Sequence, residues 1–218
     1  MLEAKNIHKS YGALKVLKGV DINVGKGEVV AIVGASGAGK STLLHILGTL
    51  DTPDQGTVTI DGKNLFSNST KELARFRNVH LGFVFQFHNL LPEFSALENV
   101  MMPGLIAGKS EKEVRKKAGE LLSLLGLSSR ADHKPSELSG GEQQRTAVAR
   151  ALVNSPSLVF ADEPSGNLDS KNAGELHELF FKLKQELGHT FVIVTHNASF
   201  ADMADRKLQM KDGAILST

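Results

Sequence analysis

The fold is indicated by the stretch Gly34-Ala35-Ser36-Gly37-Ala38-Gly39-Lys40-Ser41-Thr42, which fits the phosphate-loop pattern G-x-x-x-x-G-K-[ST]. A β-branched, apolar run from Glu28 to Val33 precedes it, and a helical pattern follows it. This order of strand, loop and helix is the context in which the pattern binds phosphate. A plain glycine loop opening a helix is the simpler alternative, but a chance match in such a chain arises on the order of 1% of the time. We therefore predict a nucleotide site.

The residue types in this loop suit a nucleoside triphosphate and its magnesium ion. Glycines let backbone N–H groups turn inward around phosphate oxygens, and the N-terminus of the following helix adds a partial positive charge. Lys40 is expected to reach the β- and γ-phosphates, and the Ser41 hydroxyl is expected to bind Mg²⁺. All residues from Gly34 to Thr42 are therefore candidates for contact with ATP.

Composition narrows the classes of function. The chain has 218 residues, which at about 150 residues per domain corresponds to one large domain or a core with a subdomain. Its 25 Lys and Arg against 24 Asp and Glu give a net charge of +1, so it lacks the basic footprint expected for nucleic acid. With no cysteine, it has no disulfide, thiol nucleophile or cysteine-ligated metal site.

The sequence contains no pattern for secretion or for spanning a membrane. The residues from Met1 to Lys5 include an acid and no apolar run, unlike a signal peptide. The purest apolar stretch runs only from Val29 to Val33, far short of the ~20 residues that cross a bilayer. We expect a cytoplasmic chain whose role at a membrane depends on a partner.

Three further runs predict buried strands, at residues 81–85, 158–161 and 191–194. Polar residues follow each of them. Because ligands of open parallel sheets gather beyond the carboxyl ends of the strands, these residues are expected to face the phosphate loop across one crevice. They are Gln86, Asp162 with Glu163, and Thr195 with His196.

The acidic pair and the histidine suit the chemistry of ATP hydrolysis. Asp162 suits Mg²⁺ bound through water, because a carboxylate is a hard oxygen ligand. Glu163 is placed to orient or deprotonate the attacking water, and His196 to contact the γ-phosphate. Taken alone, Asp-Glu-Pro would more often be a solvated turn and His196 a helix-start residue. The phosphate loop in the same chain favours the catalytic interpretation.

Helical patterns separate the strands. One runs from Ser170 to Leu187 with Gly188 as its C-cap, and another ends at Gly126. In the opening third, residues 16–24 and 56–62 instead indicate short antiparallel strands, with Asp61-Gly62 as a turn.

These patterns predict an α/β, P-loop (RecA-like) fold with a mostly parallel sheet, an antiparallel β subdomain and a helical insertion. We expect one domain over residues 1–218. Residues 1–86 and 157–218 would form the ATP-binding core, and residues 87–156 a helical subdomain.

A second glycine pair opens a helix at residues 138–145, Leu-Ser-Gly-Gly-Glu-Gln-Gln-Arg. Ser139 with Glu142 three residues later forms a capping box, which is the ordinary explanation. A cap does not need two glycines, however. Unpaired N–H groups at the start of a helix also bind anions. Ser139, Gly140 and Gly141 are therefore candidates for a second surface that binds phosphate.

Across nearly its whole length the chain resembles the nucleotide-binding subunits of ABC transporters, since all these motifs occur in that family's order. The resemblance implies an ABC ATPase fold and a head-to-tail dimer. In that dimer each ATP lies between one chain's phosphate loop and the other's residues 138–143. It also implies roles for Gln86 at the metal and in catalysis, for Asp169 at the nucleotide, and for Tyr11 stacked on adenine. A lone tyrosine near an N-terminus would otherwise more often be packing.

Within the family, residues 85–100, 133–139 and 163–169 look most like ATPase subunits of bacterial lipoprotein-releasing complexes, with macrolide-type exporters and a cell-division complex as close relatives. Ser165 departs from many relatives, which have threonine there. The likeness implies a chain peripheral to the cytoplasmic face of the inner membrane. Permease subunits would dock near the segment from Phe87 to Val100, although Phe87, Leu90, Leu91 and Phe94 could instead be core.

Two other classes remain. ABC ATPases that act on DNA or ribosomes usually carry a coiled-coil insertion, zinc-binding cysteines or two tandem ATPase units, and none of these occurs here. A scaffold in which ATP switches conformation without transport is compatible with the sequence. The membrane partner would distinguish a scaffold from a transporter.

Overall fold

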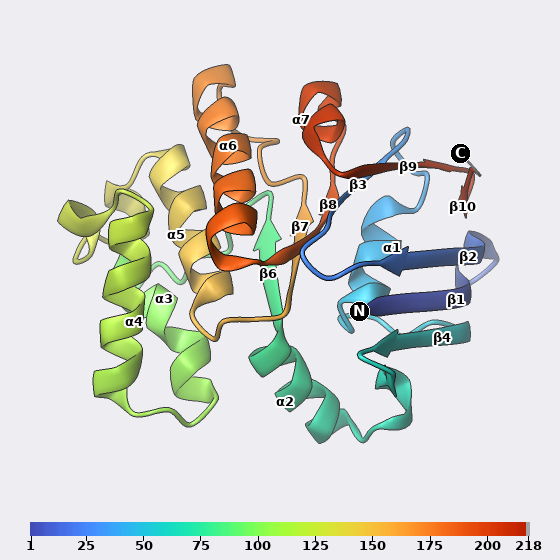
Figure 1. Cartoon of the computed structure of the whole chain (residues 1–218), viewed down its shortest axis with the longest axis horizontal. Coiled ribbons are helices and arrows are strands. Elements are labelled where there is room, and N and C mark those ends of the chain that lie inside the picture. Colours follow the sequence, from blue (N-terminus) through green and yellow to red (C-terminus); the bar gives the residue numbers. More distant parts are fainter. Residues whose placement is uncertain (217–218) are drawn as a thin grey trace.

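The computed structural model describes residues 1–216, apart from the side chain of Leu187, and contains two sheets (Figure 1). Strands of the larger sheet have the order β10-β9-β3-β8-β7-β6. Its central pairs, β3 with β8, β8 with β7 and β7 with β6, are parallel. The bounds are β3 Val29–Val33, β6 Leu81–Phe85, β7 Leu158–Asp162, β8 Thr190–Val194, β9 Arg206–Lys211 and β10 Ala214–Ile215.

All four strands expected from apolar runs are confirmed, each within one residue at either end. Strand β9 was not expected. It pairs in parallel with β3, but its buried residues Leu208 and Met210 alternate with exposed polar ones, because it lies near the edge of the sheet.

The smaller sheet is antiparallel and has the order β2-β1-β4-β5. It confirms the strands expected in the opening third, and Asp61 and Gly62 form the turn after β4 with positive φ angles of 49° and 77°. Its first strand was missed, because its buried positions alternate irregularly with exposed ones. The bounds are β1 Leu2–Tyr11, β2 Leu14–Val24, β4 Gln55–Ile60 and β5 Lys63–Asn64.

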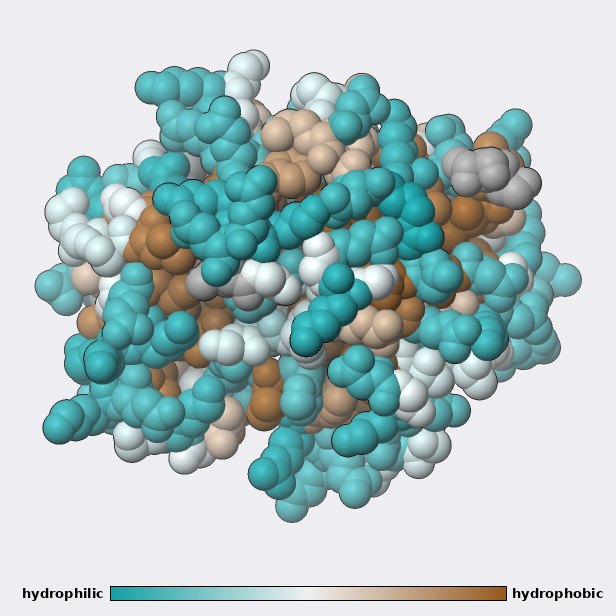
Figure 2. Space-filling model, viewed as in Figure 1, coloured by the Kyte–Doolittle hydropathy of each residue, from teal (hydrophilic) through white to brown (hydrophobic). Residues whose placement is uncertain are grey.

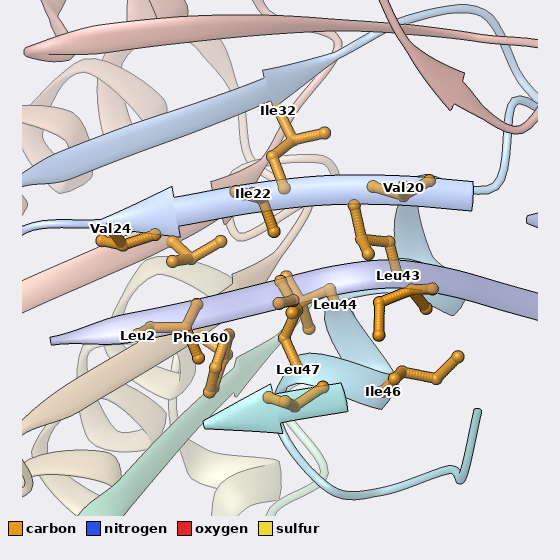
Figure 3. Packing of buried hydrophobic residues seen from close by; sticks show 14 of the residues in the cluster. Leu2, Val20, Ile22, Val24, Ile32, Leu43, Leu44, Ile46, Leu47 and Phe160 are labelled. Atoms are coloured by element: carbon orange, nitrogen blue, oxygen red, sulfur yellow. The ribbon is translucent and has the colours of Figure 1, made fainter. Parts of the chain in front are cut away.

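Helix α1 (Lys40–Leu47) lies between the two sheets (Figure 3). Four of its side chains, Leu43, Leu44, Ile46 and Leu47, are fully buried. They pack in one cluster with Leu2 and Val20 of the smaller sheet and Ile32 and Phe160 of the larger one. This helix is therefore held from both sides.

Most of the remaining helices cover the face of the larger sheet that is opposite α1. A second apolar cluster joins the other face of the larger sheet to α3, α4, α5, α6 and α7, while α2 lies between β5 and β6 in the chain (Figure 1). Hydrophilic residues cover most of the face shown in Figure 2. The bounds are α2 Thr70–His80, α3 Ala96–Ile106, α4 Glu111–Leu124, α5 Gly140–Leu152, α6 Ser170–Leu187 and α7 Ala198–Met203, with 3₁₀ turns at Leu65–Ser67, Ser128–Arg130 and Pro135–Glu137.

The predicted helix from Ser170 to Leu187 is confirmed at both ends, with Gly188 as its left-handed C-cap. Residues 87–156 form α3, α4 and α5, and no strand lies in this fully described segment. The cluster shared by these helices and the sheet extends across the expected subdomain boundary, so that division stays a prediction. Among the described residues, no helix is both long enough and apolar enough to cross a bilayer.

Replacing Leu44 by alanine is expected to lower the free energy of unfolding by about 2–5 kcal/mol, because it leaves a cavity between the two sheets. The matched control is Leu124→Ala on α4, where the leucine is 36% exposed. It should cost less than about 1 kcal/mol. Urea unfolding followed by circular dichroism measures both, and equal losses would contradict the assigned role of α1.

Candidate active site

The phosphate loop connects the end of β3 to the start of α1. Its glycines adopt left-handed backbone angles, with φ of 154° at Gly34, 77° at Gly37 and 98° at Gly39. A Cβ on Gly34 would lie 2.2 Å from the Met210 carbonyl oxygen, so no other residue fits there. Lys40 Nζ donates to the carbonyls of Gly34 and Ala35 at 2.9 and 3.0 Å. The lysine is therefore held directly over the loop.

A cleft of about 620 Å³ brings most of the predicted site residues together. Gln86, Glu163 and His196 line it from the ends of β6, β7 and β8, opposite the phosphate loop. Ala35, Ala38, Asp162 and Thr195 do not line it, and Ala38 and Thr195 are buried. The other lining residues are Tyr11, Leu14, Val16, Gly34, Ser36, Gly37, Gly39, Lys40, Ser41 and Thr42.

Two of the residues predicted to hold Mg²⁺ touch each other at the edge of the cleft. Ser41 Oγ donates to Asp162 Oδ1 at 3.0 Å, and the other carboxylate oxygen lies 3.8 Å from His45 Nε2. A hydroxyl and a carboxylate are the hard oxygen ligands that Mg²⁺ prefers. The donor set therefore fits the ion, with Gln86 on the cleft wall.

Glu163 and His196 form a close pair. The Glu163 carboxylate lies 2.8 Å from His196 Nδ1 and accepts the His196 backbone N–H at 3.1 Å. Glu163 itself has a positive φ of 47°, and its N–H donates to the Val194 carbonyl at 2.9 Å. A carboxylate held in this way beside a phosphate site is positioned to act on a water molecule.

Tyr11 is anchored by its hydroxyl and leaves half of its surface exposed to the cleft. The hydroxyl donates to Asp51 Oδ2 at 2.5 Å, and this bond raises the pKa of Tyr11. The ring is 51% exposed and Lys9 Nζ lies 5.1 Å from its centroid. An exposed, fixed ring can stack on a base, and Asp51 as its anchor was not foreseen.

Gln86 is hydrogen-bonded to the loop that carries Glu163. Its partner there is Asn167, for which the sequence predicted no separate role. Gln86 Nε2 donates to Asn167 Oδ1 at 3.0 Å, and Asn167 Nδ2 donates to the Gln86 carbonyl at 3.1 Å. This reciprocal pair joins positions 81 residues apart in the chain. Only the three-dimensional pairing of β6 with β7 reveals it.

Arg150 of α5 holds the segment that follows Gln86. Its guanidinium donates to the carbonyls of His88 and Asn89 at 2.6 and 2.5 Å, and burial lowers its pKa. Both residues have left-handed φ angles, 58° and 49°. An arginine in the last turn of a helix gives no sequence signal for such a contact, so it was missed.

The second glycine pair lies outside this cleft. Ser139 caps α5 and forms the predicted capping box with Glu142, and neither Gly140, Gly141 nor Asp169 lines the cleft. Instead these residues adjoin one another: a Cβ on Gly141 would lie 2.5 Å from Asn172 Oδ1, and the Asn172 amide donates to Asp169. The α5 N-terminus thus forms a second surface on the same chain.

Known proteins resemble this chain over its whole length. Residues 17–166 match the family described as ABC transporter. Two relatives named lipoprotein-releasing system ATP-binding protein LolD are similar: the one in Porphyromonas gingivalis is 61% identical, over 100% of this chain and 99% of its own. The one in Bacteroides thetaiotaomicron is 59% identical, over 99% of each. A dimeric, post-hydrolysis structure of the ATP-binding cassette MJ0796 with ADP and Pi has a TM-score of 0.91 and 42% identity, over 100% of this chain and 97% of that one.

The α5 cap predicts a pH dependence of stability. Arg130 and the Ser139 cap lower the pKa of Glu142 from 4.5 to about 2. A carboxyl with a depressed pKa stabilises the fold above pH 4.5, and this contribution is lost as the pH falls towards 2. In Glu142→Gln the contribution is absent, so the unmodified chain should be more stable near neutrality and the difference should shrink below pH 4.5. Urea unfolding at a series of pH values measures this; a constant difference would refute it.

Proposed function

The chain belongs to the ABC transporter family, with the ATPase activity and ABC ATPase fold expected from its sequence, and we propose that it powers a bacterial lipoprotein-releasing complex. Similarity over the full length to relatives of that name supports the complex. The single observation that supports the chemistry is the Glu163–His196 pair facing Lys40 across one cleft.

The chain's own residues supply position and charge for hydrolysis. Backbone N–H groups of the phosphate loop and the Lys40 ammonium neutralise the charge on phosphate oxygens. Glu163 orients the attacking water and takes its proton, while His196 both steadies the carboxylate and reaches the γ-phosphate. Ser41 and Asp162 would hold Mg²⁺, which supplies further charge neutralisation when bound.

We propose that two copies form a head-to-tail dimer around ATP. Ser139 and Gly140 lie outside the chain's own cleft, so a second chain is needed to bring this helix N-terminus onto a bound nucleotide. The dimeric state of the MJ0796 cassette supports this arrangement.

A permease segment is proposed to dock beside Gln86. A groove of about 520 Å³ lies between α2, α3 and α5, lined in part by Phe85, Asn89 and Arg150. Ile106, 69% exposed, lines it, and Phe87, 74% exposed, lies in the chain between the lining residues Phe85 and Asn89. Phe87, Leu91 and Phe94 are exposed and Leu90 is half-buried, so this segment is not simply core. The proposed occupant is a cytoplasmic helix of a membrane subunit, which would hold the chain at the inner membrane.

Glu163→Gln is expected to reduce ATP turnover by at least about 100-fold while leaving ATP affinity nearly unchanged, because the carboxylate acts on water. The variant should then accumulate as an ATP-bound dimer, measurable by light scattering. Adding Ser139→Arg should keep ATP binding and prevent the dimer. Near-normal turnover in Glu163→Gln, or the same mass with and without ATP, would contradict these roles.

Depletion of the chain should leave outer-membrane lipoproteins in the inner membrane, because two or three acyl chains at ~0.8 kcal/mol per buried CH₂ do not leave a bilayer unaided. Lys40→Ala should fail to restore their sorting. Ile106→Asp, in the groove, should keep ATP turnover in the isolated chain and also fail to restore sorting. Fractionation of the two membranes measures this. Normal sorting with raised drug sensitivity would instead indicate an exporter, and filamentous cells a division complex.

A further inference from the structure

One buried, titratable side chain near the active site does not itself line the cleft. His177 lies in the middle of α6 and is 5% exposed. Its neighbours on the inner side of that helix, Leu176, Phe180 and Leu183, are apolar and join the second cluster. An imidazole among them requires a polar partner, because an unpaired polar group is costly in an apolar interior.

The partner of His177 belongs to the loop that carries Glu163. His177 Nε2 lies 3.0 Å from Ser165 Oγ. Ser165 is two residues beyond Glu163, and the turn between them is closed by a bond from the Gly166 N–H to the Glu163 carbonyl at 3.0 Å. The histidine therefore holds this loop to the body of α6.

The face of the same imidazole packs against the segment that carries His196. Its ring is stacked on Phe200 of α7, with centroids 3.8 Å apart and planes 9° from parallel. The Phe200 N–H donates at 3.0 Å to the side chain of Asn197, which directly follows His196. Helices α6 and α7 stand beside each other in Figure 1, and the Phe200 ring also contacts Phe180 and Phe181.

Burial lowers the pKa of His177 below the usual value for histidine, which favours the neutral ring. A neutral imidazole has one donor and one acceptor nitrogen, so it can exchange a hydrogen bond with a hydroxyl and stack on an aromatic ring without burying a charge. A leucine or phenylalanine at this position could pack equally well and would leave Ser165 without this bond.

We infer that His177 is a positioning residue for ATP hydrolysis, which aligns Glu163 with His196 by bonding Ser165 and stacking on Phe200. The Glu163–His196 contact of 2.8 Å joins two segments from different strands, and His177 contacts both segments. A small displacement of a catalytic group lowers the rate without loosening substrate binding. This inference rests on the proposed roles of Glu163 and His196.

Steady-state phosphate release by the full chain with ATP and Mg²⁺ tests it. His177→Phe keeps a ring against Phe200 and removes the hydrogen bond, and Ser165→Ala removes the same bond from the other side. Each should lower kcat about three- to tenfold, as expected for one lost hydrogen bond, with the KM for ATP within about twofold. Because both remove one interaction, the double variant should be no slower than the slower single one.

A conservative variant and a matched control separate positioning from stability. His177→Gln can still reach Ser165 and should be faster than His177→Phe. His189→Phe is the control. His189 is a half-buried histidine that does not line the cleft, and its Nδ1 lies 3.1 Å from the backbone oxygen of Pro156. It should lower the thermal unfolding midpoint and leave kcat unchanged.

Three results would each overturn the inference. The first is an unchanged kcat in His177→Phe, and the second is a double variant in which the effects of the two single variants multiply. The third is a His177→Gln chain that is no faster than His177→Phe. Glu163→Gln measured in parallel distinguishes a failure of the His177 role from a failure of the proposed active site. If Glu163→Gln is inactive and His177→Phe is not slowed, only the role of His177 fails. If Glu163→Gln hydrolyses ATP normally, the proposed roles at the active site fail as well.

Discussion

Helix α1 is buried between two sheets, and this constraint fixes the point from which the whole nucleotide site is built. Its first residue, Lys40, directly follows the left-handed Gly39. The phosphate loop therefore leads straight into the N-terminus of α1, and the buried helix holds both the loop and the positive end of its dipole in place. Leucines and an isoleucine at four of its eight positions make contacts on both sides. A loop that binds a highly charged group is thereby supported by a buried apolar cluster.

The order of strands in the larger sheet determines which other groups can reach that loop. Strands β3, β8, β7 and β6 are adjacent and parallel, so the residues after their carboxyl ends lie along one edge. His196, Glu163 and Gln86 come from three separate parts of the chain and line the cleft for this reason. The α5 N-terminus does not share that edge, and Ser139 and Gly140 therefore do not line the cleft of their own chain.

Much of this arrangement could be predicted from the sequence, because both strands and phosphate loop depend on local patterns. Continuous apolar runs predict β3, β6, β7 and β8, and the rule that ligands gather beyond parallel strands predicts the cleft positions of Gln86, Glu163 and His196. Strands β1 and β9 were not predicted. The buried and exposed residues of β1 alternate irregularly, and β9 lies near the edge of its sheet. The sequence also did not predict the contacts of Asn167, Arg150 and His177. Each joins residues 12 to 81 positions apart through side-chain geometry that no local pattern encodes.

The Arg150 contact has a geometric consequence for communication between the proposed docking groove and the N-terminus of α5. Arg150 and Gly140 lie on one uninterrupted helix, and at 1.5 Å per residue they are about 15 Å apart along its axis. The guanidinium bonds the backbone after Gln86, so the C-terminal turn of α5 is joined to the proposed docking groove. Tilting α5 by about 10° about Arg150 would move its N-terminus by about 2.6 Å over that length, roughly the length of a hydrogen bond. A tilt of that size would be enough to make or break a hydrogen bond at the helix end that the proposed second chain would meet.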